Sequence, residues 1–259
     1  MNPYELRAED FTFAPYKHEG DSGAMLLATA KSDPSIQYIV KSEYPEIACN
    51  EFMYHHVAAA VGLYTQDVWI LSGLADRNHA VAIRYVPNAR KFTYDKADEE
   101  SKQTYFKFKT LYAILNEDDS EEIYYDGQGR LFKLDNAASF NMSELAIRHA
   151  INYGNDELPE FVWKMLKSGI SLVQYEKYAL LLEIFKKYFG KEAVEIGYAF
   201  FEQFVSIDIS KVESAAEALE KIYPFTITEY YPAFVNVRVE ACKRFISENG
   251  IERFLREPN

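Results

Sequence analysis

The sequence predicts an α+β protein in which a small β-rich lobe precedes a larger, mostly helical lobe. Short β-rich segments bounded by Gly, Ser, Asp and Pro turns fill most of the first ninety residues, with one helical interruption. From Ser143 onward the hydrophobic spacing is helical to the end. The 259 residues are 48% hydrophobic, which is enough to bury a substantial core. We expect the two lobes at 1–90 and 91–259.

The first lobe is expected to contain three antiparallel strands, one helix and two further strands. The pattern places the strands at 12–18, 24–30, 37–41, 66–71 and 79–86. Between the third and fourth strands, apolar residues recur at helical spacing: Ile47, Met53, Val57 and Ala60. Gly62 then supplies a C-terminal stop, which predicts a helix over 45–61.

The second lobe is expected to begin with a helix over 100–115 that leads into an acidic segment, 116–122. Two short alternating runs surround the turn residues Asp126-Gly127-Gln128-Gly129, so we expect a β-hairpin at about 122–135. The helices that follow are expected to be interrupted near four residues: Gly154, Gly169, Gly190 and Pro224.

Charge and composition exclude several function classes. The chain has 28 Lys and Arg against 40 Asp and Glu, a net charge of −12, which disfavours direct nucleic-acid binding and attachment to anionic membranes. No apolar run reaches the length of a membrane span, and the N-terminus lacks an apolar signal region, so a cytoplasmic protein is expected. Two isolated cysteines, Cys49 and Cys242, are too few for a disulfide scaffold or a zinc site.

Four features follow one another in an informative order. A Gly-rich turn between two strands precedes a strand that ends in Lys41, and ten residues later the predicted helix carries Glu51. After the lobe boundary, Asp135 ends the second strand of the hairpin. A phosphoryl-transfer site needs backbone amides over the phosphates, a fixed cation, a carboxylate that holds this cation, and acidic oxygens for Mg²⁺. The sequence offers a candidate for each part.

These segments resemble the HipA-like kinases, a bacterial branch of the protein-kinase-like fold. The resemblance spans roughly 15–245 and is strongest in the first lobe, and it rests on the order of four short segments: GDSGAMLLATAKSDPSIQYIVK, NEFMYHHVAAAVGL, GRLFKLDNAASF and IYPFTITEYYPAF. It implies a two-lobe kinase-like fold and an ATP-dependent kinase that uses Mg²⁺ to phosphorylate Ser or Thr of a protein substrate.

The resemblance also implies residue roles. Lys41 would reach the α- and β-phosphates of ATP and pair with Glu51, and Asp135 would hold Mg²⁺. The strand and hinge beside the adenine would be 81–88, including Val86. The loop over the nucleotide phosphates would be formed by Gly20, Ser22 and Gly23.

The acidic segment departs from the family pattern. Counting back from Asp135 places Glu122 where the family has an Asn that binds metal, and Asp118 is the candidate catalytic base. The family's Arg or Asn-His after this Asp is replaced by Asp119-Ser120. An alternative is therefore a catalytically impaired, pseudokinase-like module that acts by binding a protein partner. A third possibility is a helical interaction domain with an unrelated β cap, which predicts no contact between Lys41 and Glu51.

Each candidate residue also has an ordinary structural interpretation. Lys41 could be a solvated lysine at a strand end, and Glu51 could simply pair with His55 one helical turn later. The turn at 20–23 has the composition of a common hairpin turn, Asp135 could cap a turn, and 117–122 could be a solvated loop. The sequence leaves these interpretations open.

Overall fold

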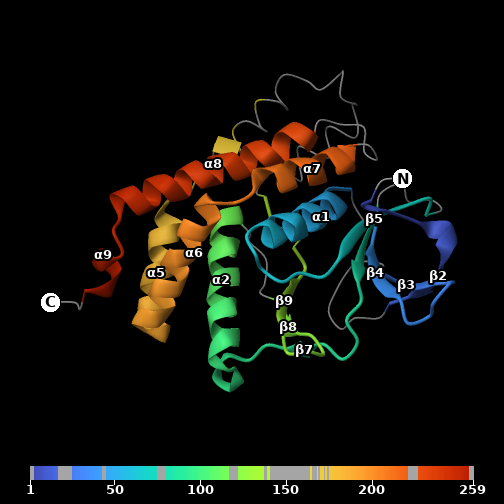
Figure 1. Cartoon of the computed structure of the whole chain (residues 1–259), viewed down its shortest axis with the longest axis horizontal. Helices are drawn as coiled ribbons and strands as arrows, with labels where there is room; N and C mark the ends of the chain where they lie inside the picture. The colour runs from blue at the N-terminus through green and yellow to red at the C-terminus, as the bar shows by residue number, and fades with distance from the viewer. Residues whose placement is uncertain are drawn as a thin grey trace.

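A computed structural model describes most of the chain (Figure 1), namely residues 3–16, 25–42, 45–74, 80–116, 122–136, 139–140, 164, 168, 170–171, 173, 175–220 and 227–256. Several predictions lie outside the described residues: the roles of Gly20, Ser22, Gly23 and Asp118, and the helix breaks near Gly154, Gly169 and Pro224.

The first lobe is built on a six-stranded sheet with the order β1-β5-β6-β4-β3-β2. Its strands are β1 (Glu5–Arg7), β2 (Phe11–Pro15), β3 (Leu26–Ala30), β4 (Gln37–Lys41), β5 (Val68–Ser72) and β6 (Val81–Arg84). The five predicted strands are confirmed, and β4 has the predicted bounds. All neighbours pair antiparallel except β1 and β5, which pair in parallel.

Strand β1 was absent from the predicted order of three strands, one helix and two strands, so that order is wrong at its start. Its three residues, Glu-Leu-Arg, carry no alternation long enough to predict a strand. The strand exists because Glu5 to Arg7 lie in register with Ile70 to Ser72 of β5, a pairing far apart in sequence.

The two faces of the sheet bury different sets of side chains. Val81 and Ile83 of β6 belong to the main core, whereas Ala80 and Ala82 belong to a second, smaller core with Phe11, Tyr38 and Val40. This alternation follows from the strand period of two residues. Helix α1 (Pro45–Ala60) packs against β5 and β6 and also against helix α7 (Ile209–Glu220) of the second lobe. The main core therefore continues from the sheet into the helical lobe.

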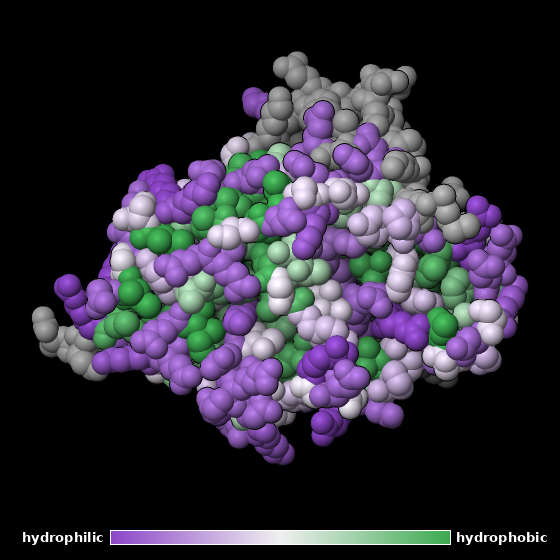
Figure 2. Space-filling model, in the orientation of Figure 1, coloured by the Kyte–Doolittle hydropathy of each residue, from purple (hydrophilic) through white to green (hydrophobic). Residues whose placement is uncertain are grey.

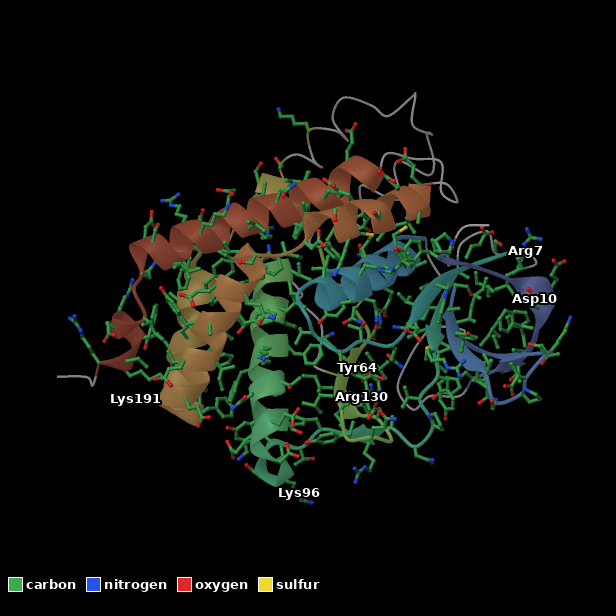
Figure 3. All side chains as sticks on the ribbon, viewed as in Figure 1. Arg7, Asp10, Tyr64, Lys96, Arg130 and Lys191 are labelled. Carbon is green, nitrogen blue, oxygen red and sulfur yellow. The ribbon has the colours of Figure 1, made fainter. Side chains whose placement is uncertain are left out.

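A three-stranded sheet, β7-β8-β9, lies between the first sheet and helix α2 (Figure 1). It consists of β7 (Arg90–Lys91), β8 (Glu122–Tyr125) and β9 (Leu131–Leu134), so the predicted hairpin is confirmed and β7 is an addition. Its turn is joined to the segment after α1, because the Arg130 guanidinium lies 3.9 Å from the Tyr64 ring centroid (Figure 3). Arg130 also pairs with Asp126 at 2.8 Å.

The helical lobe packs around α2 (Glu99–Leu115), whose predicted bounds of 100–115 are confirmed within one residue. The other helices are α5 (Tyr175–Phe189), α6 (Lys191–Val205), α7, α8 (Ile227–Glu248) and α9 (Glu252–Leu255). Gly190 separates α5 from α6 at a φ of 88°, which confirms the predicted break there. Cys49 and Cys242 are both buried.

The surface in view is a mixture of polar and apolar residues with a hydrophilic rim (Figure 2). Among the described residues, the exposed large hydrophobic side chains are all on α5: Leu180, Ile184 and Tyr188. No helix in the described part of the chain combines the length and apolar character needed to cross a membrane.

Candidate functional site

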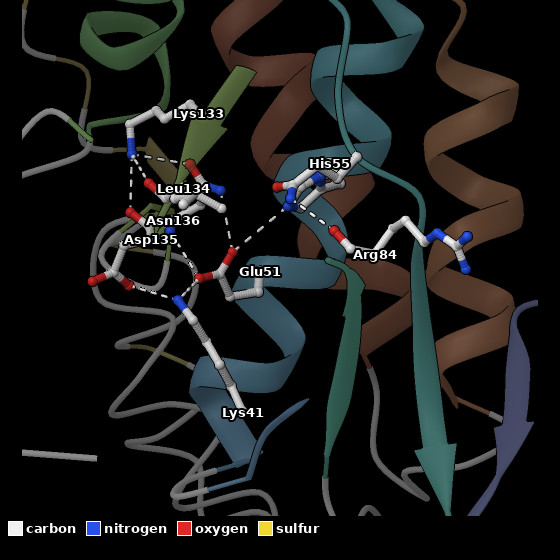
Figure 4. A network of polar contacts seen from close by, with 9 residues as sticks. Lys41, Glu51, His55, Arg84, Lys133, Leu134, Asp135 and Asn136 are labelled. Atoms are coloured by element: carbon white, nitrogen blue, oxygen red, sulfur yellow. Dashed lines mark hydrogen bonds and ion pairs between the residues drawn. The ribbon is translucent and has the colours of Figure 1, made fainter. Parts of the chain in front are cut away.

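Lys41 and Glu51 are brought together by the sheet and helix α1. Lys41 ends β4, and its neighbour Val40 is buried in the second core, so alternation turns the Lys41 side chain to the opposite face, toward α1. Residues 48–54 of α1 are each no more than 2% exposed, which places Glu51 inside the protein. Lys41 Nζ donates a hydrogen bond to Glu51 Oε1 (Figure 4). This contact contradicts the alternative of a helical interaction domain with an unrelated β cap.

Asp135 joins the pair from the hairpin, ninety-four residues away in the chain from Lys41. It follows β9 directly, and its Oδ1 accepts a hydrogen bond from Lys41 Nζ at 2.8 Å (Figure 4). The Asp135 side chain is 36% exposed, whereas that of Glu51 is fully buried. Lys41 therefore bridges two carboxylates: that of Glu51, which is closed to solvent, and that of Asp135, which is partly exposed to solvent.

Asn136 connects the hairpin to α1 a second time. Its backbone N–H donates to Glu51 Oε1 at 2.9 Å, and its side-chain Nδ2 donates to Glu51 Oε2 at 3.1 Å. Glu51 therefore accepts hydrogen bonds on both oxygens, which is what a buried carboxylate requires. The local sequence does not mark Asn136 as a site residue, because an Asn after a strand looks like an ordinary turn residue.

Helix α1 is also fixed to the helical lobe on both sides of Glu51. The Tyr231 hydroxyl of α8 donates to Asn50 Oδ1 at 2.8 Å, and Gln203 of α6 donates to the carbonyl of Val61 at 2.6 Å. These bonds hold the helix, and with it Glu51, against α6 and α8.

The charges of the bridged groups are set by one another. Burial by itself would lower the pKa of the Lys41 ammonium, but Glu51 and Asp135 outweigh it and raise the pKa well above its ordinary value. Burial likewise would raise the pKa of the Glu51 carboxyl, but Lys41 and the Asn136 amide lower it to about 2. Lys41 is therefore a cation and Glu51 an anion at neutral pH.

His55 lies one turn after Glu51 on α1, with its Nε2 3.8 Å from Glu51 Oε2. Burial lowers the pKa of the His55 imidazole to about 4, so the ring is neutral at neutral pH. Glu51 and His55 are therefore i,i+4 neighbours on α1, as the sequence predicts, but the charged partner of Glu51 is Lys41.

Of the other predicted site residues, two lie in the described part of the chain: Val86 and Glu122. Val86 follows β6 and is half-buried, and Glu122 begins β8, where it pairs with Leu134, the residue before Asp135. Their roles in nucleotide and metal binding remain predictions. Within the residues that the structure describes, no group of three or more His, Cys, Asp or Glu side chains is placed to hold a metal ion.

One further polar residue of the site was not predicted. Lys133 in β9 is 3% exposed and donates to oxygens of the residues that follow it, including the Asn136 side chain at 3.0 Å (Figure 4). A lysine between Phe132 and Leu134 in a short strand is usually read as the solvent-facing position of an alternating pattern. The local sequence holds no signal that both faces of β9 are covered.

Comparisons with known proteins support the fold and leave the family open. No family model matches the chain, and no curated protein matches it in sequence. Among solved structures, the chain is similar to the crystal structure of a Helicobacter pylori proinflammatory kinase, CtkA, with a TM-score of 0.52 and 11% sequence identity. The match covers 95% of this chain and 99% of that one. The predicted two-lobe, kinase-like α+β fold is confirmed over nearly the whole chain.

Proposed function

We propose that this protein is a HipA-like, ATP-dependent kinase that transfers the γ-phosphoryl group of ATP to a Ser or Thr hydroxyl of a protein substrate. One observation carries the proposal: Lys41 Nζ bridges Glu51 of α1 and Asp135 of the hairpin. The three residues come from three separate elements, and each had been assigned a part of one phosphoryl-transfer site. The fold that the chain shares with a kinase supports the same conclusion.

Lys41 supplies the cation for the α- and β-phosphates of ATP. Its raised pKa keeps it charged, and its ion pair with Glu51 fixes the ammonium at the end of β4 instead of leaving it on a mobile stem. An ordered cation stabilises phosphate oxygens without having to be reorganised when the nucleotide binds.

Asp135 would hold Mg²⁺, and its chemistry fits that ion. A carboxylate oxygen is a hard donor of the kind that Mg²⁺ prefers, and the 36% exposure of the side chain leaves it reachable from solvent. Glu122 would be a second oxygen ligand. The metal, when bound, neutralises charge on the phosphates, while Lys41 and Glu51 orient the nucleotide. Asp118 would accept the proton of the substrate hydroxyl.

The acidic segment favours a second candidate, a pseudokinase-like module that binds a protein partner without phosphoryl transfer. The HipA-like kinases, which the chain resembles, carry Arg or Asn-His after the catalytic Asp, and this chain has Asp119-Ser120 at that place. Clustered carboxylates raise one another's pKa unless a metal or a cation compensates them. Such a protein would keep the Lys41–Glu51 pair and could still bind ATP.

Transfer of label from γ-³²P-ATP separates the two candidates. The wild type, incubated with Mg²⁺ or Mn²⁺, is expected to label itself or a protein in a cytosolic extract. Asp135→Ala is expected to lose this transfer, whereas Asp95→Ala, which removes an exposed carboxylate of the short 3₁₀ helix η2 (Tyr94–Lys96), keeps it. Nucleotide-dependent thermal stabilisation without any label transfer would reject the kinase in favour of the binding module. The absence of both would also reject the kinase, and would leave only a binding module that takes up no nucleotide.

A further inference from the structure

Lys133 is a buried cation that the proposed chemistry does not use. Its Nζ donates hydrogen bonds to the carbonyl oxygens of Leu134 at 3.2 Å and Asp135 at 2.9 Å, and to the side-chain Oδ1 of Asn136 at 3.0 Å. Three consecutive residues therefore turn an oxygen toward one ammonium group. The Nζ also lies 5.5 Å from the ring centroid of Tyr54 on α1.

The segment whose oxygens accept hydrogen bonds from Lys133, residues 134–136, has an unusual backbone conformation. Asp135 has a φ of 55°, in the left-handed region that residues with a Cβ rarely adopt. In this conformation the Asp135 carboxylate faces Lys41 while its carbonyl faces Lys133 (Figure 4). A residue in this region persists only where its surroundings hold it there.

The same ammonium is linked to the far side of the site through Asn136. The Asn136 side chain accepts from Lys133 and donates to Glu51, and Glu51 in turn accepts from Lys41. Lys41 also donates to the Asp135 carboxylate, and the Asp135 carbonyl accepts from Lys133, so two lysines, two acidic residues and Asn136 form one closed ring. Removing the Lys133 ammonium would leave the oxygens of Leu134, Asp135 and Asn136 without this donor. It would also weaken the hold on the Asn136 side chain, which donates to Glu51.

We propose that Lys133 is a positioning residue that fixes the Asp135 carboxylate for a divalent cation bound with a nucleotide phosphate. The proposal rests on the proposed function, in which Asp135 is the metal ligand. Lys133 touches neither phosphate nor metal in this role, and acts through the backbone of Asp135 and through Asn136. Groups that orient a metal ligand in this way typically change metal affinity by about 10–100-fold when they are removed.

The first test needs no ligand. Crystal structures of the unliganded wild type and of Lys133→Met are compared, because methionine fills much of the same volume and donates no hydrogen bond. We expect Asp135 to leave its positive φ and its carboxylate to separate from Lys41 in the variant. An unchanged Asp135, still at 2.8 Å from Lys41 as in the wild type, would overturn the proposal.

The second test measures the Mg²⁺ concentration that gives half-maximal stabilisation by ATP in a thermal shift assay. Lys133→Met is expected to raise this concentration about 10–100-fold, while stabilisation by ATP in excess EDTA stays that of the wild type. Lys243→Met, which removes an exposed lysine of α8, serves as the matched control and is expected to match the wild type. An unchanged Mg²⁺ requirement in Lys133→Met would overturn the positioning role.

Lys133→Arg keeps the experiment decisive if the methionine variant does not fold. Arginine retains the charge and the donors, but its larger planar head changes where they lie, so the Mg²⁺ requirement is expected to rise. A folded Lys133→Arg protein in which Asp135 has moved away from Lys41 while the Mg²⁺ requirement stays that of the wild type would overturn the proposal. A wild type that binds no nucleotide would reject the proposed function, and the unliganded structures would still decide whether Lys133 positions Asp135.

Discussion

Replacing Lys41 by methionine is expected to destabilise the protein, although Lys41 belongs to the proposed nucleotide site. Glu51 is fully buried and its charged partner is Lys41. In the variant, the carboxylate would keep the two donors of Asn136, and its neighbour His55 is neutral at neutral pH. A buried charge that loses its partner is one of the costliest defects in a folded protein.

The pKa of Glu51 sets the size of this effect. The fall of the pKa from its ordinary 4.5 to about 2 corresponds to about 3 kcal/mol of stability at neutral pH. Lys41→Met loses this stabilisation and leaves the Glu51 carboxylate buried without its cation. We expect the free energy of unfolding to fall by about 3–5 kcal/mol, the range seen when buried ion pairs are broken. For a chain of this length, that lowers Tm on the order of 10 °C.

Urea unfolding at pH 7 of four proteins measures the pair itself: wild type, Lys41→Met, Glu51→Gln and the double variant. We expect the double variant to be more stable than Lys41→Met, because the neutral amide introduced by Glu51→Gln needs no cation. The penalty of Lys41→Met should also shrink in acid. Wild-type Glu51 contributes stability that is present above pH 4.5 and lost as the pH falls toward about 2, whereas the unpaired carboxyl of the variant takes up a proton and loses its charge.

Two outcomes would refute this reasoning. One is a Lys41→Met protein as stable as the wild type at pH 7, since a fully buried Glu51 could not then depend on Lys41. The other is a double variant that is no more stable than Lys41→Met, which would mean that the loss comes from packing around the lysine stem.

Two further predictions concern the helices. His55 and His56 each have a pKa lowered from 6.5 to about 4, first by burial, so the unfolded chain binds their protons more readily. The stability that the two neutral histidines contribute is therefore complete above about pH 6.5 and is lost as the pH falls toward 4. At pH 5 the free energy of unfolding is expected to be lower by about 1–2 kcal/mol per histidine. Equal urea midpoints at pH 7 and pH 5 would contradict this. Gly197→Ala in α6 would place a Cβ 2.8 Å from the Phe185 ring and is expected to cost about 1–2 kcal/mol after the gain in helix propensity. Gly250→Ala, where the Cβ meets no atom within 4 Å, is the control, and equal Tm values for both variants would refute the packing argument.

Much of the fold could be predicted because several elements have strong local signals. The strand ending at Lys41, the helix α1 and the hairpin around Asp126 to Gly129 all follow from alternation, helical spacing and turn residues. Strands β1 and β7 could not be predicted in the same way. They have three and two residues, and each exists only because a partner strand supplies its hydrogen bonds.

The site was predicted in part. Lys41, Glu51 and Asp135 were identified from their order along the chain, and the structure brings the three together. Asn136 and Lys133 were missed, because an Asn after a strand and a Lys within one are common in solvent-exposed positions. Burial distinguishes them here, and no local pattern encodes it.

The sequence by itself determined where the longer strands and helices form, since backbone periodicity and turn chemistry act over a few residues. Only the tertiary structure decided that Glu51 is fully buried, that Lys41 is shared between two carboxylates, and that Lys133 faces inward. The physical reason is that burial and Coulomb interaction depend on distances between β4, α1 and β9. Those distances are set by packing between residues far apart in the chain.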